Sequence, residues 1–211
     1  MKKILLIGDS IRQGYDKYVK MAFEGTAEVY YPAENCRFAA YVARNIHEWK
    51  SKLGLDSDLN LVHWNAGLWD DLVLLDGEHL TPLPIYRYYI ERTCKILTQQ
   101  FPHARVIFAT STPVQEELFT TCKRYNADTQ EYNDAAVEIA VRYGMQINDL
   151  YALCADMPKS YYSDLTHLYT KDGTRLLTDR VVSVIGDALG IPGKALDYDA
   201  LFAARTDVTG V

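Results

Sequence analysis

The sequence has 211 residues, of which 48% are hydrophobic, so it can bury one sizeable core and is short for two ordinary domains. Its formal net charge of −6, with no stripe of basic residues, argues against nucleic acid or an anionic membrane surface as the main partner. No apolar stretch approaches the roughly 20 residues of a membrane span. The apolar stretch near the N-terminus is shorter than the ~7–15 residues that form the apolar region of a signal peptide. We expect one cytoplasmic domain over 1–211, with 192–211 as a C-terminal tail of uncertain structure.

Apolar runs and amphipathic segments alternate along the chain. The short apolar runs predict strands near residues 3–7, 27–31, 59–64, 105–110 and 145–148. Helical spacing of apolar residues predicts helices near 11–22, 38–53, 84–101, 126–143 and 172–189. This alternation is typical of a three-layer α/β/α flavodoxin-like fold with a central five-stranded parallel sheet. The segment 70–84, which contains a glycine and two prolines, is expected to be a long loop that shapes a pocket.

The first predicted strand ends in a sharp turn that carries a serine. Gly8 stops the apolar run that precedes it, and a helix is predicted to begin beside Ser10. Ligands bind at the carboxyl ends of the strands in such sheets, so Ser10 stands at the expected site. The backbone amides at the start of the helix would favour a negative charge developing there.

A second informative segment lies near the C-terminus, where Asp164 and His167 are three residues apart. A serine hydroxyl is a weak nucleophile at neutral pH, so it needs a base to remove its proton, and histidine titrates in the right range. A carboxylate then fixes the tautomer of the imidazole and stabilises the cation that forms. The pattern indicates that Ser10, His167 and Asp164 form a hydrolytic triad.

These segments resemble the SGNH (GDSL-type) superfamily of esterases and lipases. The resemblance rests on Gly8-Asp9-Ser10-Ile11 and on Asp164-x-x-His167 before an apolar helix. Further segments match in order and spacing, namely 110–114, 132–133, 148–151 and 167–173. The resemblance implies that Ser10 is the nucleophile, that Asp164 and His167 are the acid and base, and that no metal or organic cofactor is required. The superfamily acts on acetylated sugars, lysophospholipids, thioesters and simple esters, and the resemblance does not choose among them. The acidic composition and the Trp and Tyr residues expected at the entrance favour a short acyl or acetyl ester of a small molecule or carbohydrate.

The middle blocks of the sequence depart from the usual pattern of this superfamily, which offers a glycine amide and an asparagine side chain to the oxyanion. Aligning Gly67 and Asp70 with the third block puts Trp69 where the asparagine would stand, so Asn65 is the expected side-chain donor. The second block has no glycine, and the backbone N–H of Cys36 is the expected donor there. The N–H of Ser10 completes the predicted oxyanion hole.

Three other interpretations remain open at this point. The four cysteines are widely spaced and are expected to be reduced, but a Cys-His nucleophile pair built on Cys36 is an alternative to Ser10. A flavodoxin-like module that binds phosphate at the first turn is a second alternative, although residues 8–14 contain few glycines. A catalytically inactive relative that serves as an interaction protein is the third.

Overall fold

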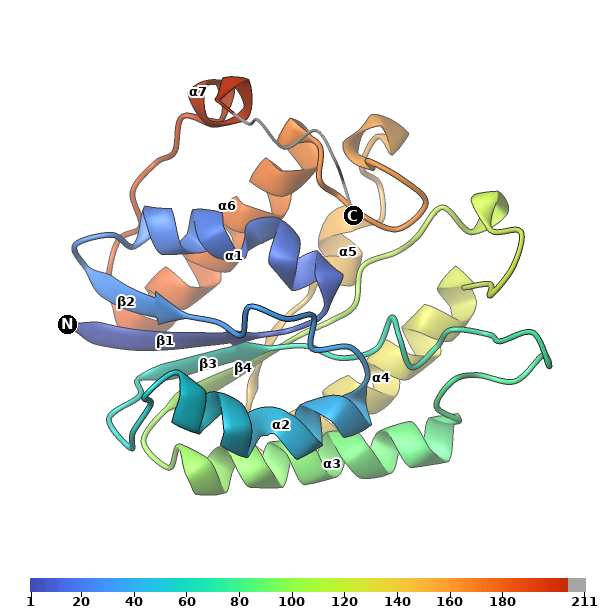
Figure 1. Ribbon diagram of the computed structural model, residues 1–211, viewed down its shortest axis with the longest axis horizontal. Coiled ribbons are helices and arrows are strands. Elements are labelled where there is room, and N and C mark those ends of the chain that lie inside the picture. Colours follow the sequence, from blue (N-terminus) through green and yellow to red (C-terminus); the bar gives the residue numbers. More distant parts are fainter. Residues whose placement is uncertain (205–211) are drawn as a thin grey trace.

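A central parallel sheet organises the chain, and the computed structural model describes residues 1–204 of it (Figure 1). Within these residues, five strands form one sheet in the order β2-β1-β3-β4-β5. Their bounds are Lys2–Ile7 for β1, Ala27–Tyr30 for β2, Leu61–Trp64 for β3, Arg105–Ala109 for β4 and Gln146–Asn148 for β5. All four pairings are parallel, which confirms the predicted sheet and its flavodoxin-like strand order.

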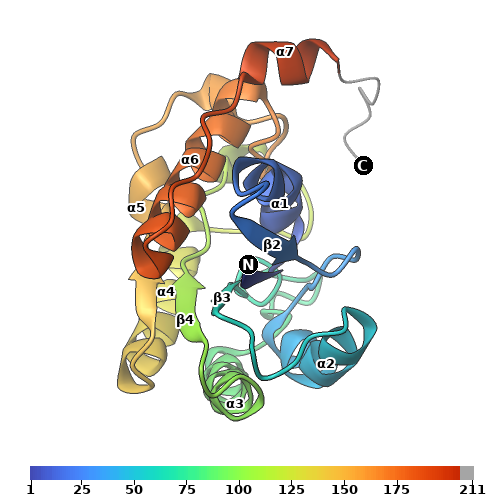
Figure 2. The ribbon, with the colours of Figure 1, turned by 90° about the vertical axis from the view of Figure 1, so that its left-hand side faces the viewer.

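Helices cover both faces of this sheet, as Figure 2 shows. One face carries α1 (Ser10–Ala22), α5 (Leu150–Cys154) and α6 (Lys171–Leu189). The opposite face carries α2 (Ala39–Lys52), α3 (Leu83–Gln100) and α4 (Asn126–Arg142). These two layers of helices, with the sheet between them, form the predicted three-layer α/β/α arrangement.

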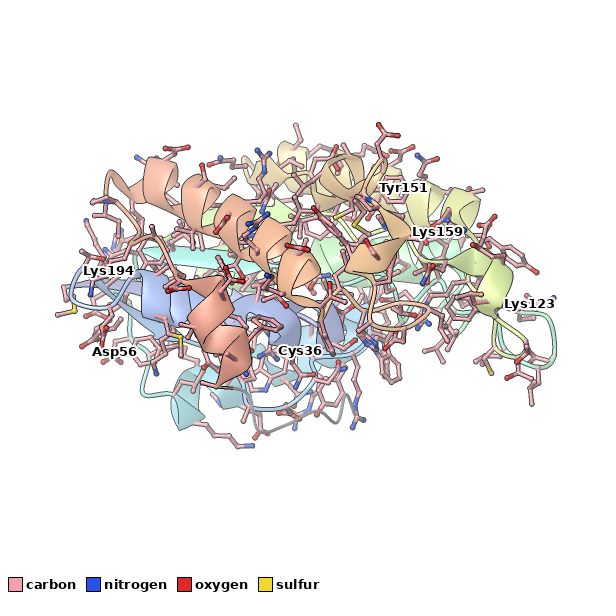
Figure 3. The ribbon with its side chains drawn as sticks, turned by 90° about the horizontal axis from the view of Figure 1, so that it is seen from above. Cys36, Asp56, Lys123, Tyr151, Lys159 and Lys194 are labelled. Atoms are coloured by element: carbon pink, nitrogen blue, oxygen red, sulfur yellow. The ribbon has the colours of Figure 1, made fainter. Side chains whose placement is uncertain are left out.

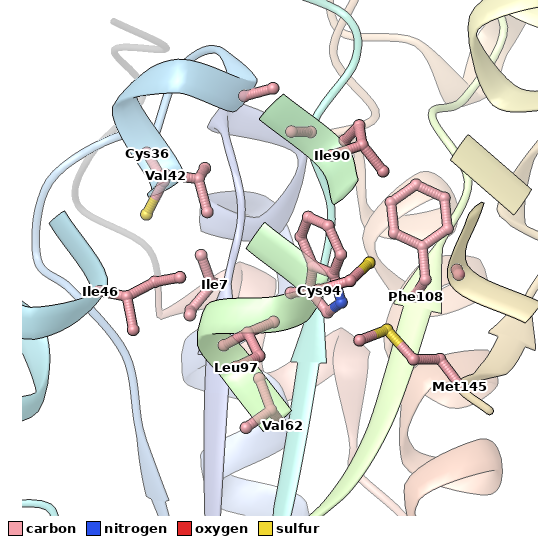
Figure 4. Packing of buried hydrophobic residues seen from close by; sticks show 14 of the residues in the cluster. Ile7, Cys36, Val42, Ile46, Val62, Ile90, Cys94, Leu97, Phe108 and Met145 are labelled. Carbon is pink, nitrogen blue, oxygen red and sulfur yellow. The ribbon is translucent and has the colours of Figure 1, made fainter. Parts of the chain in front are cut away.

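The strand β1 shows why the central strands are apolar throughout. Its side chains alternate between the two faces, so Ile4 and Leu6 enter the core under α1 and α6, while Leu5 and Ile7 enter the core under α2 and α3. Figure 4 shows Ile7 in the second of these cores, among side chains from α2, α3 and β4. Because both faces are buried, every residue from Ile4 to Ile7 has to be apolar.

The predicted long helices match the structure to within a few residues, whereas the short ones were not predicted. These are α5, α7 (Tyr198–Ala203) and two 3₁₀ turns at Glu116–Leu118 and Lys159–Tyr161. The helix α7 lies within the segment expected to be a tail, and it packs on α1 through stacking of Phe202 on Tyr18. The rest of that segment, 205–211, lies outside the described residues.

The parallel strands run toward one end of the molecule, which is where the candidate site lies. In Figure 3, Lys123 and Lys159 mark this end, and Asp56 and Lys194 mark the opposite one. The segment 65–82, which follows β3, runs along this end without adding a helix or a strand to the sheet, in agreement with the predicted loop. No helix in the described part of the chain is long and apolar enough to cross a membrane.

Candidate active site

Ser10 is the first residue of α1 and follows β1 after a turn of only two residues. The helix begins there because Asp9 caps it: the Asp9 Oδ1 atom accepts the N–H of Ile11 at 2.9 Å. The first amides of a helix have no acceptor within the helix, so the Ser10 N–H points out of its N-terminus. Ser10 therefore presents both a hydroxyl and a backbone donor at the carboxyl end of β1.

The structure brings Ser10, His167 and Asp164 into one hydrogen-bonded chain. His167 Nε2 lies 2.8 Å from Ser10 Oγ, and His167 Nδ1 lies 2.7 Å from Asp164 Oδ2. An ionised carboxylate only accepts, so Nδ1 carries the proton and Nε2 is left to accept from the serine hydroxyl. This is the tautomer that lets a histidine take a proton from serine.

Asp164 is held in its ionised form by the turn that contains it. Its Oδ1 atom accepts the backbone N–H groups of Thr166 at 2.7 Å and His167 at 2.8 Å. Partial burial alone would raise the pKa of Asp164, but these amides and the His167 ring outweigh it and lower the pKa below its usual value. The helix α6 is capped by a different residue, Thr170, so Asp164 is not needed as a helix cap.

The turn that carries Asp164 and His167 is hydrogen-bonded to the chain beyond β4. Both groups of Gln115 take part: its side-chain amide donates to the Asp164 carbonyl and its backbone N–H donates to the Leu165 carbonyl, each at 2.9 Å. Within the turn, the Ser163 N–H donates to the His167 carbonyl at 2.8 Å. These bonds fix the turn against the sheet at the end where Ser10 lies.

Asn65 follows the last residue of β3 and lies beside Gly8, in the turn that leads from β1 to Ser10. It is buried, and its backbone N–H donates to the Ile7 carbonyl at 3.1 Å. Neither atom of its carboxamide forms a hydrogen bond within residues 1–204, and Oδ1 is fully enclosed. The carboxamide of Asn65 is thus available as a donor beside the turn that holds Ser10.

The backbone N–H of Cys36 is already occupied, because it donates to the Gly8 carbonyl at 3.1 Å. The Cys36 thiol is buried against the guanidinium of Arg12, with Sγ 3.9 Å from Nη2, and burial raises its pKa to about 11. His167 directs its Nε2 atom to Ser10. The arrangement therefore favours a Ser-His pair over the alternative Cys-His pair.

The third sequence block has a structural role that its alignment did not reveal. Asp70 is completely buried, and both of its carboxylate oxygens accept the N–H of Ala39 at the start of α2, at 3.0 and 3.2 Å. Loss of hydration raises the pKa of Asp70 to about 7. Asp70 thus caps α2 from a distance, and Asn65 is the side chain of this block that lies near Ser10.

Arg12 was not singled out from the sequence, although it organises the turn around Ser10. Its side chain is 1% exposed and donates to the carbonyls of Gly8, Pro32 and Glu34 while it pairs with Asp16. The available signal was an arginine and an aspartate four residues apart within the apolar stripe of the first predicted helix. Arg12 links the loop after β2 to the end of β1.

The described residues contain no group of three or more His, Cys, Asp or Glu side chains that could hold a metal ion. His63, for example, is buried in the core, where its Nε2 atom faces the Asn148 amide at 3.1 Å. Burial lowers the pKa of His63 to about 4, so it is neutral. Trp64 packs in the core against Phe108.

Comparison with known proteins relates the architecture to esterases. No protein-family model and no curated protein matches the sequence. Among solved structures, the acetyl xylan esterase AlAXEase is 15% identical with a TM-score of 0.71, over 87% of this chain and 99% of that one. The lipase/acylhydrolase from Enterococcus faecalis is 19% identical with a TM-score of 0.71, over 93% and 100%. Axe2, an acetylxylan esterase from Geobacillus stearothermophilus, is 16% identical with a TM-score of 0.69, over 88% and 94%. The chain has the fold of the SGNH (GDSL-type) hydrolases.

Proposed function

We propose that the protein is a serine hydrolase that cleaves carboxylic esters through an acyl-enzyme on Ser10. The observation that carries this proposal is the hydrogen-bonded chain from Asp164 through His167 to Ser10 Oγ, with distances of 2.7 and 2.8 Å. Both distances lie within the hydrogen-bond range expected between a nucleophile and its base and between that base and the group that orients it. The esterase and acylhydrolase names of the similar structures support the same reaction.

The reaction divides into two halves. Ser10 Oγ attacks the ester carbonyl while His167 Nε2 takes its proton, and Asp164 stabilises the imidazolium. The C–O bond to the alcohol then breaks, His167 returns the proton to the leaving oxygen, and the acyl group stays on Ser10. His167 takes a proton from water, which attacks the acyl carbon. The bond between this carbon and Ser10 Oγ then breaks, His167 returns the proton to Oγ, and the acid leaves.

The oxyanion of each tetrahedral intermediate needs hydrogen-bond donors. We assign the N–H of Ser10, at the N-terminus of α1, and the side-chain amide of Asn65 to this role. The Cys36 N–H, expected from the sequence as a third donor, would first have to release the Gly8 carbonyl. Two donors are therefore proposed.

The substrate proposal is an ester with a short acyl group, such as an acetyl group on a small molecule or a carbohydrate. Two of the similar structures are named acetyl xylan esterases, which supports the acetyl group and the carbohydrate. An acetyl ester of a neutral sugar carries no charge, so the net charge of −6 does not oppose its binding.

The test uses a fluorophosphonate probe and intact mass, together with turnover of p-nitrophenyl acetate, butyrate and octanoate. We expect a single adduct on the wild type, no adduct on Ser10→Ala, and the fastest turnover with acetate. The matched control is Ser57→Ala, because Ser57 is exposed before β3, away from the carboxyl ends of the strands. Equal labelling of Ser10→Ala and the wild type would refute the nucleophile. No labelling and no turnover of the wild type would favour the binding-module and inactive-relative alternatives.

A further inference from the structure

Tyr169 touches both the base and the nucleophile residue of the proposed triad. Its ring stacks on the His167 ring, with the centroids 4.7 Å apart and the planes 25° from parallel. Its hydroxyl donates to the backbone carbonyl of Ser10 at 2.5 Å. A single side chain thus bridges the turn that carries His167 and the first residue of α1.

Gly14 provides the space that Tyr169 occupies. A Cβ atom at residue 14 would lie 2.7 Å from Cε1 and 2.8 Å from Cδ1 of the Tyr169 ring, closer than real Cβ contacts. Gly14 lies inside α1 without a positive φ, so the backbone conformation does not demand a glycine there. Glycine is unfavourable inside a helix, so the close approach of Tyr169 is the reason for it.

The two triad hydrogen bonds hold the His167 ring at Nδ1 and Nε2, so both act on the edge of the ring. Rotation about the Cβ–Cγ bond tilts the ring out of its present plane and moves Nε2 away from Ser10 Oγ. A stacked aromatic ring opposes this tilt, and its electron-rich face also favours the imidazolium that forms when the serine is deprotonated.

We infer that Tyr169, seated on Gly14, is a positioning residue that keeps the His167 ring aligned with Ser10 Oγ. This inference rests on the proposed ester hydrolysis. Tyr169 acts through the ring of His167, on which it stacks, so its removal should lower the rate of the chemical step and leave substrate binding unchanged. The hydroxyl bond to the Ser10 carbonyl fixes Tyr169 itself relative to the nucleophile.

The experiment measures kcat and KM for p-nitrophenyl acetate in four variants: Tyr169→Phe, Tyr169→Leu, Gly14→Ala and the double variant Gly14→Ala/Tyr169→Leu. Because a misplacement of about 1 Å can cost about 100-fold in rate, we expect Tyr169→Leu and Gly14→Ala each to lower kcat about 10- to 100-fold with little change in KM. Tyr169→Phe keeps the ring and should lose less than Tyr169→Leu. The double variant should be no slower than Tyr169→Leu, because the added methyl group then has no ring to displace.

The matched control is Tyr132→Phe, which removes another tyrosine hydroxyl bonded to a backbone carbonyl, that of Thr81 at 2.7 Å, in the opposite core. Its kcat should stay at the wild-type level, and so should the NMR signal of the His167 Nδ1–H proton. That signal should broaden or shift in Tyr169→Leu. This readout separates alignment of the ring from a general loss of stability.

An unchanged kcat in Tyr169→Leu would overturn the inference, and so would losses in Gly14→Ala and Tyr169→Leu that multiply in the double variant. If Tyr169→Leu does not fold, the kcat values of Gly14→Ala and Tyr169→Phe decide. A reduced kcat in at least one of these variants supports the inference, and wild-type kcat in both refutes it. Ser10→Ala is run alongside. Full activity of Ser10→Ala would refute the proposed function, whereas inactive Ser10→Ala with normal Tyr169 variants would refute only the inference.

Discussion

Gly8 and Asn65 are so close that a Cβ atom on Gly8 would lie 2.3 Å from the Asn65 Oδ1 atom. The contact exists because β1 and β3 are neighbours, and the Asn65 N–H donates to the Ile7 carbonyl at 3.1 Å. The glycine before Ser10 therefore does more than end a strand: it leaves room for the proposed oxyanion donor.

Gly8→Ala should accordingly resemble Asn65→Ala. The added methyl group displaces the carboxamide, and loss of one oxyanion donor costs about 100- to 1,000-fold in kcat. Both variants are to be compared in p-nitrophenyl acetate turnover. Asn60→Ala serves as the control, because Asn60 precedes the same strand at its other end and accepts the Lys3 N–H. Wild-type kcat in Asn65→Ala would remove this residue from the oxyanion hole.

Asp164→Asn should lower kcat about 1,000- to 10,000-fold, because an amide can present N–H to Nδ1 and so favour the wrong tautomer of His167. The structure also predicts that Asp164 stays ionised in mildly acidic solution, since its pKa is lowered. The control is Asp156→Asn, which removes the same charge from an exposed position. Equal kcat values for the two variants would contradict the role of Asp164.

The buried carboxyl of Asp70 should make stability depend on pH. Its pKa is about 7 in the folded protein and about 3.8 when exposed, so the folded state holds more protons between these values. Stability from this group is then greatest at low pH and falls as pH rises from about 4 to 7, by up to about 1.4 kcal/mol per pH unit. Urea unfolding of wild type and Asp70→Asn at several pH values should show the difference in slope. Asp187→Asn, at an exposed position of α6, should keep the wild-type slope, and a wild-type slope in Asp70→Asn would count against the prediction.

Arg12→Lys should destabilise the protein by about 2–4 kcal/mol, because a lysine cannot serve three carbonyls and Asp16 at once, and it leaves buried acceptors unpaired. Thermal or urea unfolding measures this loss. The same substitution at Arg105, which is exposed at the start of β4, should change stability by less than about 0.5 kcal/mol. Equal stability of the two variants would show that the Arg12 bonds contribute little.

The sequence predicted the strands and helices in which the pattern of apolar residues extends over enough positions to show a period. The predicted strands 3–7 and 105–110 each contain an uninterrupted apolar run of four residues, and the helix 172–189 repeats its apolar face over several turns, so their limits agree with β1, β4 and α6. The helices α5 and α7 have five and six residues, too few to show a period. Their caps, Asp149 and Asp197, were the only local signals.

The candidate site was predictable where its residues are neighbours in sequence or at a strand end. Asp164 and His167 share one turn, and Ser10 and Asn65 each follow a strand, so the sequence alone predicted that these four residues belong to one site. The partner of the Cys36 N–H was not predictable, because it depends on how the loop after β2 returns to the end of β1. The same is true of Tyr169, whose neighbour Gly14 is distant in sequence and close only in the fold.

The separation of 157 residues between Ser10 and His167 has a consequence for the synthesis of the protein. Because synthesis runs from the N- to the C-terminus, Ser10 is made 157 residues before His167 and has no imidazole partner from this residue in the meantime. The helix α6, which packs beside α1 on the same face of the sheet, is made later still. A nascent chain that ends before His167 therefore lacks the base of the proposed triad, and a premature stop before this residue should yield a product that fluorophosphonate does not label at Ser10.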